Sequence, residues 1–465
     1  MKERLTILHT NDLHSHLENW PRIRRYLISE RQQILNQYKG SSVITVDLGD
    51  ALDRAHPLTE VTNGTANVEL LNQIHYDAVT IGNNEGLTNT HDQLDELYKD
   101  ANFDVVLGNI LNAKNNVYPT WAKPDKIIKT EQGTRVLILG MTAPYSLTYP
   151  ILGWQPIEPE KVIPKLLAQN KGKYDIVVLL SHLGINQDRI LARKFPDLTV
   201  IIGSHTHHLL VHGEKVNQSI LAAAEKWGHY IGEITLELEN HRVISKKARV
   251  IETADLPELP EDASEISGYE KQGEMLLAKN KIARIPTEMG TNLIGHSRLV
   301  DEGLHAIMDK AQTKIGILNS GLFLTNLPAG VIDRNQLHQM LPHAMHVMKV
   351  TLNGYDLWRL MKEMEKNRNF LVKFPQKGMG FRGKYFGLLH YGGLRFNDNG
   401  QLLFHEEPVS PIETYEVAMP DHYLFVPFFP TIDIVGKNEI LYDESLRDVF
   451  GDYLAKNYPL TPNKY

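Results

Sequence analysis

The stretch Leu5-Thr6-Ile7-Leu8-His9-Thr10-Asn11-Asp12-Leu13-His14-Ser15-His16 decides the fold of this chain. An apolar run ends in a carboxylate, Asp12, and an imidazole, His14, two residues apart. If residues 5–10 form a buried β-strand, both side chains lie just past its carboxyl end, where open α/β sheets place their ligands. Carboxylate oxygens and neutral imidazole nitrogens bind divalent metal ions. The stretch therefore predicts a strand that carries metal ligands.

Four further apolar runs follow in the sequence, and each ends in potential ligands. The runs are rich in β-branched residues and lack a helical period, so we expect central parallel strands that are buried on both faces. Five coincidences of this kind indicate one joint metal site. The four segments are residues 43–50, which end at Asp50, residues 78–85, which contain Asn83 and Asn84, residues 176–182, which end at His182, and residues 200–207, which contain His205 and His207.

Composition narrows the class of protein. A chain of 465 residues is too long for one core, so two or more domains are expected. The net charge of -7 and the lack of a basic run argue against a nucleic acid polymer as partner. Cysteine is absent, which excludes thiolate ligands and disulfides. No stretch approaches the ~20 apolar residues that span a bilayer, and no leader precedes the first run, so we expect a cytoplasmic protein without a membrane partner.

Helix and strand signals divide the chain into two parts. Residues 1–252 are expected to form a layered α/β domain with helices at 21–38, 66–74, 90–98, 158–170 and 186–195 and hairpins at 126–141 and 230–251. Residues 253–289 are acidic, contain prolines and open into a polar helix, which is typical of a linker. Residues 290–465 are expected to form a second α/β domain, with a strand at 414–419.

The order Asp-x-His, Gly-Asp, Gly-Asn, His, Gly-x-His-x-His resembles that of the calcineurin-like metallophosphoesterases. The two-domain layout resembles the 5′-nucleotidase / UDP-sugar hydrolase family within them. The resemblance is close from Leu5 to His207 and looser in the second half, where Asn319-Ser320-Gly321, Pro328-Ala329-Gly330 and Leu341-Pro342-His343 stand where the family has similar segments. It implies a layered metallophosphoesterase sheet domain followed by a C-terminal α/β domain of the 5′-nucleotidase type that binds substrate.

The resemblance also implies a site with two divalent metal ions. Asp12, His14 and His207 would bind one ion, Asn83, His182 and His205 would bind the other, and Asp50 would bridge them. The chemistry supports the bridge independently, because two ions about 3.5–4 Å apart need a shared anionic ligand. A hydroxide between the ions would attack phosphorus in line. Mixed nitrogen and oxygen ligands suit Mn, Zn, Co or Fe.

The chain departs from the family pattern at three positions. Asn84 replaces the catalytic histidine, Leu87 replaces its acidic partner, and Leu324 stands where the family has a phosphate-contacting arginine. An asparagine can hydrogen-bond a phosphoryl oxygen but cannot transfer a proton near pH 7. We therefore predict Asn84 as a catalytic residue, together with His91, or alternatively His56, as an imidazole that reaches the vacated space from a nearby loop.

Candidate substrate contacts in the second domain lie around a Gly-x-Gly-x-x-Gly segment, residues 378–383. No helix is expected after it, so a dinucleotide-binding turn is disfavoured, and a loop whose aromatic rings flank a base is favoured. Plain packing of these rings is an equal alternative. The predicted substrate-binding residues are Asn319, Phe381, Arg382, Tyr385 and Phe386.

The leading functional hypothesis is two-metal hydrolysis of phosphate esters or anhydrides in nucleotides or related metabolites, as in nucleotide catabolism. A phosphodiesterase or pyrophosphatase with a non-nucleotide substrate is the alternative among enzymes. A weakly catalytic, metal-containing binding protein is the alternative from another class, supported by the changes at Asn84 and Leu324. The expected partner is a small nucleotide or phosphate ester, and the sequence does not specify an oligomeric state.

Overall fold

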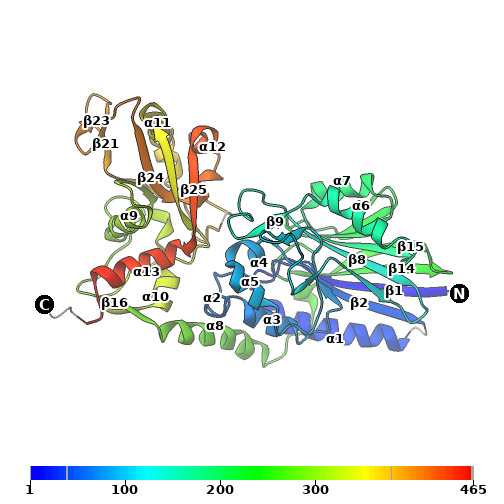
Figure 1. The fold of residues 1–465 in the computed structure, drawn as a ribbon. Helices are drawn as coiled ribbons and strands as arrows, with labels where there is room; N and C mark the ends of the chain where they lie inside the picture. The colour runs from blue at the N-terminus through cyan, green and yellow to red at the C-terminus, as the bar shows by residue number, and fades with distance from the viewer. Residues whose placement is uncertain (1, 38–39, 379, 462–465) are drawn as a thin grey trace. The chain divides into compact units, whose positions relative to one another are not determined.

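A computed structural model describes residues 2–37, 40–378 and 380–461 of the chain. The chain folds into two compact units, Met1–Gly273 and Glu274–Tyr465. Both units combine β-sheets with helices, which confirms the predicted fold class of two α/β domains (Figure 1). The division between the units falls inside the segment 253–289 that the sequence predicts as a linker.

Unit 1 contains two large sheets among its described residues. The first has the order β15-β14-β1-β2-β3-β4-β6 and the second the order β12-β13-β11-β10-β8-β7. The strands of the first are β1 (Lys2–Thr10), β2 (Ser41–Asp47), β3 (Ala78–Val79), β4 (Val105–Val106), β6 (Ala122–Lys123), β14 (Tyr230–Glu239) and β15 (Arg242–Glu252). Those of the second are β7 (Asp125–Lys129), β8 (Arg135–Thr142), β10 (Ile176–His182), β11 (Leu198–Gly203), β12 (Glu214–Val216) and β13 (Ser219–Ala222).

Parallel pairing brings the ligand-bearing strand ends together. Strand β1 pairs in parallel with β2, and β2 with β3, while β10 pairs in parallel with β8 and β11. The predicted parallel strands are thus confirmed, and the predicted hairpins are the antiparallel pairs β7–β8 and β14–β15. Because parallel strands end on the same edge of a sheet, the segments that follow β1, β2 and β3 lie side by side, as do those that follow β10 and β11.

The two sheets of unit 1 pack face to face around one apolar core. Leu5, Ile7 and Val46 of the first sheet and Ile138 and Val178 of the second are fully buried in it. Helices α6 (Pro159–Gln169) and α7 (Ile185–Lys194) cover the other face of the second sheet, and α1 (Trp20–Gln37) packs along β2 (Figure 1). This burial removes apolar surface from water on both sides of each sheet, at roughly 25 cal/mol per Å².

Shorter helices lie between the strands of unit 1. They are α2 (Pro57–Thr62), α3 (Thr65–Leu71), α4 (Asn83–Thr88) and α5 (His91–Leu97), and the short pair β5 (Ile110–Asn112) and β9 (Trp154–Pro156) accompanies them. Thr90, at the predicted start of the helix 90–98, caps α5, since its side chain accepts from the Gln93 N–H. The N-cap of α7 is Gly184, two residues before the predicted start of this helix at Asn186, and its φ of +88° suits glycine.

The polar helix of the predicted linker is α8 (Asp262–Ala278). Within unit 1 it is fastened to α1, because Arg25 pairs with Asp262 at 2.5 Å and Arg24 pairs with Glu265 at 2.7 Å. Gly273 also approaches the backbone so closely that a Cβ there would lie 2.2 Å from the Leu58 nitrogen. The start of α8 is therefore held on unit 1 by two ion pairs, and the helix packs closely against unit 1 again at Gly273.

Unit 2 is built on a sheet of order β20-β17-β24-β19-β25. Helices α9, α10 and α13 pack on one face and α11 and α12 on the other, each over its own apolar core (Figure 1). The predicted strand at 414–419 is β24. The elements are α9 (Arg298–Ala311), β17 (Ile315–Asn319), α10 (Arg334–Met340), β19 (His346–Asn353), α11 (Gly354–Leu371), β20 (Leu389–Gly392), β24 (Thr414–Pro420), α12 (Pro430–Val435), β25 (Lys437–Ser445) and α13 (Leu446–Asn457).

Two smaller sheets complete unit 2. Strand β16 (Lys281–Ile285) pairs with β18 (Gly330–Asp333), and β21 (Leu394–Phe396), β22 (Leu402–Phe404) and β23 (Glu407–Pro408) form a meander. The described residues of the whole chain include no helix that is both long and apolar enough to cross a membrane.

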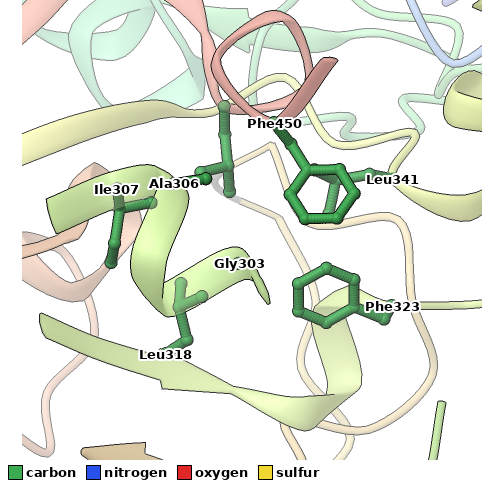
Figure 2. Close-up of a pocket in the computed structure, with 8 residues that line it drawn as sticks. Gly303, Ala306, Ile307, Leu318, Phe323, Leu341 and Phe450 are labelled. Carbon is green, nitrogen blue, oxygen red and sulfur yellow. The ribbon is translucent and has the colours of Figure 1, made fainter. Parts of the chain in front are cut away.

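A small apolar cavity lies in the core of unit 2 (Figure 2). At Gly303 a Cβ would come within 2.7 Å of the Phe323 ring, which explains the glycine in the middle of α9. The side chains around the cavity are all apolar, so it belongs to the core and offers no contact to a phosphate. Its lining residues are Gly303, Ala306, Ile307, Leu318, Phe323, Leu341, Leu446 and Phe450.

Candidate metal centre

The structure brings the seven predicted metal ligands together at the strand ends of both sheets. They come from the residues after β1, β2, β3 and β11 and from the last residue of β10. Asp12, Asp50 and His182 are at most 2% exposed. Burying two carboxylates this deeply is costly unless positive charge compensates them. The set is Asp12, His14, Asp50, Asn83, His182, His205 and His207.

One group of donor atoms consists of Asp12, His14 and His207. The Nε2 atoms of the two histidines lie 3.2 Å apart, and Asp12 Oδ1 is 3.8 Å from His14 Nε2 and 3.6 Å from His207 Nε2. Two nitrogens that each lie ~2.1 Å from one ion are separated by about 3 Å. The three side chains therefore fit a single divalent ion.

A second group lies on the other side of Asp50. Its Oδ2 is 3.4 Å from His182 Nε2 and 3.7 Å from His14 Nε2, so this carboxylate faces both groups. Asn83 Oδ1 lies 2.9 Å from His205 Nδ1, again the spacing of two ligands on one ion. Asp12 is also within reach, because Asp12, Asp50 and His182 form a close donor cluster.

The hydrogen bonding of His182 shows whether these residues suit a metal ion. The Nε2 atom is buried and has no hydrogen-bond partner among the described residues, while Nδ1 contacts the Leu48 carbonyl at 2.8 Å. Because a carbonyl only accepts, Nδ1 carries a proton, and Nε2 is the nitrogen that faces Asp50. A buried nitrogen of this kind calls for a partner, and a cation would supply it.

Electrostatics at the site favour positive charge between the donors. Burial opposes protonation of His182, but the Asp50 carboxylate raises the pKa of His182 to about 10. Burial alone would raise the pKa of Asp50, and His182 holds it well below its usual range. By contrast, burial lowers the pKa of His205 to about 4, which leaves its imidazole neutral, as metal ligation requires.

The ligand loops carry backbone strain. Five of the seven ligands have φ in the left-handed region, where non-glycine residues cost roughly 1–3 kcal/mol each and cluster at functional sites. Hydrogen bonds from Asp12 N–H to Gly49 O and from His14 N–H to Asp50 O hold the first two loops in this shape. The φ values are 51° at Asp12, 49° at His14, 50° at Asp50, 71° at His205 and 54° at His207.

Three residues that support the ligands were not predicted from the sequence. Glu85 is 1% exposed and accepts from the Asp50 and Gly82 N–H groups, each at 2.8 Å, so it ties the β2 loop to α4. Ser204 Oγ donates to Asp12 Oδ2 at 2.5 Å, and Tyr145 OH lies 3.3 Å from His205 Nε2. Glu85 had a sequence signal in its position directly after Asn83-Asn84, whereas Ser204 and Tyr145 had none.

Of the two predicted catalytic residues, the structure places only Asn84 at the site. The Asn84 N–H donates to Asp50 Oδ1 at 2.7 Å, and Nδ2 lies 3.0 Å from His14 Nδ1. His91 instead stacks on Trp154 with ring centroids 4.0 Å apart and contacts Asp95 and Asn112. His56 caps α2 by accepting from the Leu58 N–H.

The predicted substrate contacts of unit 2 are mostly internal. Asn319 donates to the Phe386 carbonyl and accepts from Tyr423 OH at 2.9 Å, and Phe386 is fully buried. Phe381 is 4% exposed and stacks on His343 with centroids 4.9 Å apart. The packing alternative thus describes these three positions in the structure.

The other two predicted contacts of unit 2 reach the surface in part. Arg382 and Tyr385 are half-buried. The Arg382 N–H donates to His343 Nδ1 at 2.9 Å, and Lys384 lies over the Tyr385 ring at 5.2 Å from its centroid.

Comparison with known proteins agrees with this site and fold. The model of the calcineurin-like phosphoesterases matches residues 5–209, and that of the 5′-nucleotidase C-terminal domain matches residues 281–425. A Bacillus subtilis (strain 168) protein named uncharacterized metallophosphoesterase YunD is 36% identical over 468 residues, which are 98% of this chain and 100% of its own. The 5′-nucleotidase of Vibrio cholerae is 23% identical over 76% of this chain and 74% of its own.

Two solved structures share the fold. The 5′-nucleotidase precursor of Thermus thermophilus has a TM-score of 0.59 at 20% identity, and the NAD nucleotidase of Haemophilus influenzae has 0.65 at 15%. Each alignment covers 98% of this chain and 97% of the other.

The fold and the site define a metal-dependent phosphohydrolase, and the enzyme predicted from the sequence is confirmed. The chain belongs to the calcineurin-like metallophosphoesterase family, in the group that carries a 5′-nucleotidase C-terminal domain.

Proposed function

We propose that unit 1 hydrolyses phosphate ester or anhydride bonds in nucleotides or related metabolites with the help of two divalent metal ions. The observation that carries this proposal is the position of Asp50, whose carboxylate faces His14 on one side and His182 on the other. Asp12, His14 and His207 would hold one ion, Asn83, His182 and His205 the other, and Asp50 both. The names of the V. cholerae and H. influenzae relatives support nucleotides as the substrate class.

The protein residues have separable roles in this proposal. Two ions bound there would supply an activated water and offset charge on the phosphoryl oxygens. The Leu48 carbonyl fixes the tautomer of His182, and Ser204 and Asn11 occupy Oδ2 of Asp12, so that Oδ1 faces His14 and His207. Asn84 is a neutral side chain at the site, whose amide nitrogen contacts His14 Nδ1 and the Leu52 carbonyl, and it would not transfer a proton to the leaving group.

A phosphodiesterase or pyrophosphatase acting on a non-nucleotide substrate is the second candidate. The change from histidine to Asn84 favours it, because a leaving group that is already acidic needs no proton donor.

We further propose a cytoplasmic setting, which the absence of cysteine and of an apolar spanning run suits. Mn, Zn, Co and Fe all suit the mixed ligand set.

The test replaces the bridging carboxylate. In Asp50→Ala we expect loss of one or both ions and of nearly all turnover of 4-nitrophenyl phosphate in the presence of Mn or Co, because the Asp50 carboxylate lies 3.7 Å from His14 Nε2 and 3.4 Å from His182 Nε2. Metal content by mass spectrometry and circular dichroism are measured on the same sample. Asp50 follows a strand, so its removal leaves the core filled.

The matched control is Asp92→Ala, because Asp92 is a fully exposed carboxylate on α5 in the same unit. We expect it to keep both ions and full turnover. Two bound ions with normal activity in Asp50→Ala would contradict the two-ion assignment, and full activity of metal-stripped wild type would contradict metal dependence itself.

A further inference from the structure

Residues 224–227 form a loop that is hydrogen-bonded to two of the segments that carry proposed ligands. The Trp227 N–H donates to the Asp12 carbonyl at 2.8 Å, and the Glu225 N–H donates to the His208 carbonyl at 3.0 Å. Asn11 bonds the same loop twice, since its Nδ2 donates to Glu225 O at 2.7 Å and its Oδ1 accepts from the Ala224 N–H at 3.2 Å. This loop therefore borders the group of Asp12, His14 and His207.

The backbone of this loop is held in an unfavourable conformation. Glu225 and Trp227 both have φ of 60°, in the left-handed region that non-glycine residues avoid. Such strain is kept only where the surroundings fix it, and it concentrates at functional positions. Here the hydrogen bonds to Asp12 and His208 fix it, and their effect is to place two side chains, Lys226 and Trp227.

Lys226 and Trp227 form a stack together with His16. The Lys226 ammonium lies 4.0 Å from the centroid of the Trp227 ring, and the His16 ring stacks on Trp227 with centroids 4.4 Å apart at 26°. All three side chains are partly exposed. The ring limits the freedom of the lysine stem, so the ammonium loses less entropy on binding a ligand.

The ammonium of Lys226 has no carboxylate partner within ion-pair distance in the described part of the chain. The neighbouring carboxylates are already engaged: Glu225 with His229 at 3.1 Å, and Glu18 with His16 at 2.7 Å. A cation that is held on a ring and is not neutralised by a neighbouring carboxylate favours an anionic ligand.

We propose that Lys226, held on Trp227, binds a second phosphoryl group of the substrate, next to the one that is hydrolysed. This deepens the proposed function, on which it rests, by assigning an anion subsite to unit 1 and a phosphoanhydride-type substrate to that subsite. Unit 2 lacks the family arginine at position 324, where Leu324 is 39% exposed, and Arg395 is paired with Glu406.

Packing alone is the competing explanation for the lysine–tryptophan contact. A lysine that merely covers a ring would leave ligand selectivity untouched when its charge is removed. Lys226→Met keeps the length of the stem on Trp227 and removes the charge, and Lys226→Arg keeps the charge. Both changes leave the backbone hydrogen bonds of the loop intact.

The experiment compares two non-hydrolysable probes, methylenediphosphonate and methylphosphonate, with full-length protein in Mn. Binding is followed by calorimetry and by tryptophan fluorescence, to which Trp227 contributes. We expect Lys226→Met to weaken methylenediphosphonate about 10- to 100-fold more than methylphosphonate, as expected for one lost charge-assisted hydrogen bond, and Lys226→Arg to restore most of the selectivity.

Lys194→Met is the matched control. Lys194 also lies over an aromatic ring in unit 1, at 5.9 Å from the Phe195 centroid, but it is paired with Glu160. We expect unchanged affinity for both probes. An equal loss for both probes in Lys226→Met, or no loss, overturns the subsite while leaving the metal proposal standing. Failure of wild type to bind either probe overturns both the subsite and the proposed function.

Discussion

At the scale of single residues, Asn84 bears most directly on the chemistry. Its backbone N–H donates to Asp50 and its carboxamide contacts His14 and the Leu52 carbonyl. These contacts place it beside both proposed ions but give it no means of protonating a leaving group. His91 and His56 have contacts of their own with Trp154 and Leu58, so neither substitutes for the missing imidazole in this structure.

The rate of hydrolysis should therefore depend strongly on the leaving group. General acid catalysis is worth about 10²–10⁴ in rate, mainly for poor leaving groups. We expect log kcat for a series of aryl phosphates to fall steeply with leaving-group pKa in wild type, and anhydrides to be preferred over simple nucleoside monophosphates. The slope should be the same in His91→Ala and His56→Ala. A flat wild-type slope that steepens in either variant would show that a relocated imidazole donates the proton.

Single residues also show which parts of the candidate site could be predicted from the sequence. The seven proposed ligands could be predicted because each lies at or just after the end of an apolar strand, which is visible in the sequence as a change from β-branched to polar residues. Ser204 and Tyr145 act through partners distant in sequence, Asp12 and His205. Partnerships between loops have no local pattern, so only the fold could reveal them.

At the scale of elements, the strands were easier to predict than the surroundings of the loops. Strands β1, β2, β10 and β11 are long apolar runs that are buried on both faces, and their parallel pairing follows from that pattern. The aromatic loop around Phe381 was harder, because rings that stack on a base and rings that pack in a core have the same composition. In the structure the face of Phe381 is taken by His343.

This loop should make unit 2 sensitive to acid. His343 Nε2 donates to the Leu322 carbonyl and Nδ1 accepts from the Arg382 N–H, an arrangement that only a neutral imidazole can make. Burial lowers the pKa of His343 and of His422 to about 3 each. The unfolded chain, with histidine pKa near 6.5, binds more protons below that pH, so stability is complete above about pH 6.5 and falls as pH drops toward 3. The slope is about 1.4 kcal/mol per pH unit for each group.

The measurement is hydrogen exchange of the segment 380–388 in full-length protein between pH 7 and 5, corrected for intrinsic rates. We expect protection to fall with pH in wild type and to fall less in His422→Leu, which removes one buried titrating group. His296→Leu serves as the control, because His296 is an exposed histidine of the same unit. Equal pH dependence in all three proteins would contradict the assignment.

At the scale of the whole molecule, two units with separate cores explain the length of the chain. Their number and type follow from the sequence, because an acidic, proline-containing segment separates two apolar patterns. The role of α8 could not be predicted from the sequence, since a polar helix has the same sequence pattern whether it is free or fastened by ion pairs. The structure fastens it to unit 1 through Arg24, Arg25 and Gly273.

The place at which unit 1 is cut should therefore matter. A fragment that ends at Gly273 keeps the Arg24–Glu265 and Arg25–Asp262 pairs and the contact with Leu58, whereas one that ends at Thr253 loses all three. Each partly exposed pair is worth up to about 1 kcal/mol, so we expect a Tm lower by several degrees for the shorter fragment.

Both fragments should retain metal, because all seven proposed ligands precede residue 208, and both should hydrolyse 4-nitrophenyl phosphate. If residues 290–465 bind substrate, both fragments should show a raised KM for the physiological substrate. Equal Tm values would show that α8 is a free linker, and an unchanged KM would remove the substrate-binding role from unit 2.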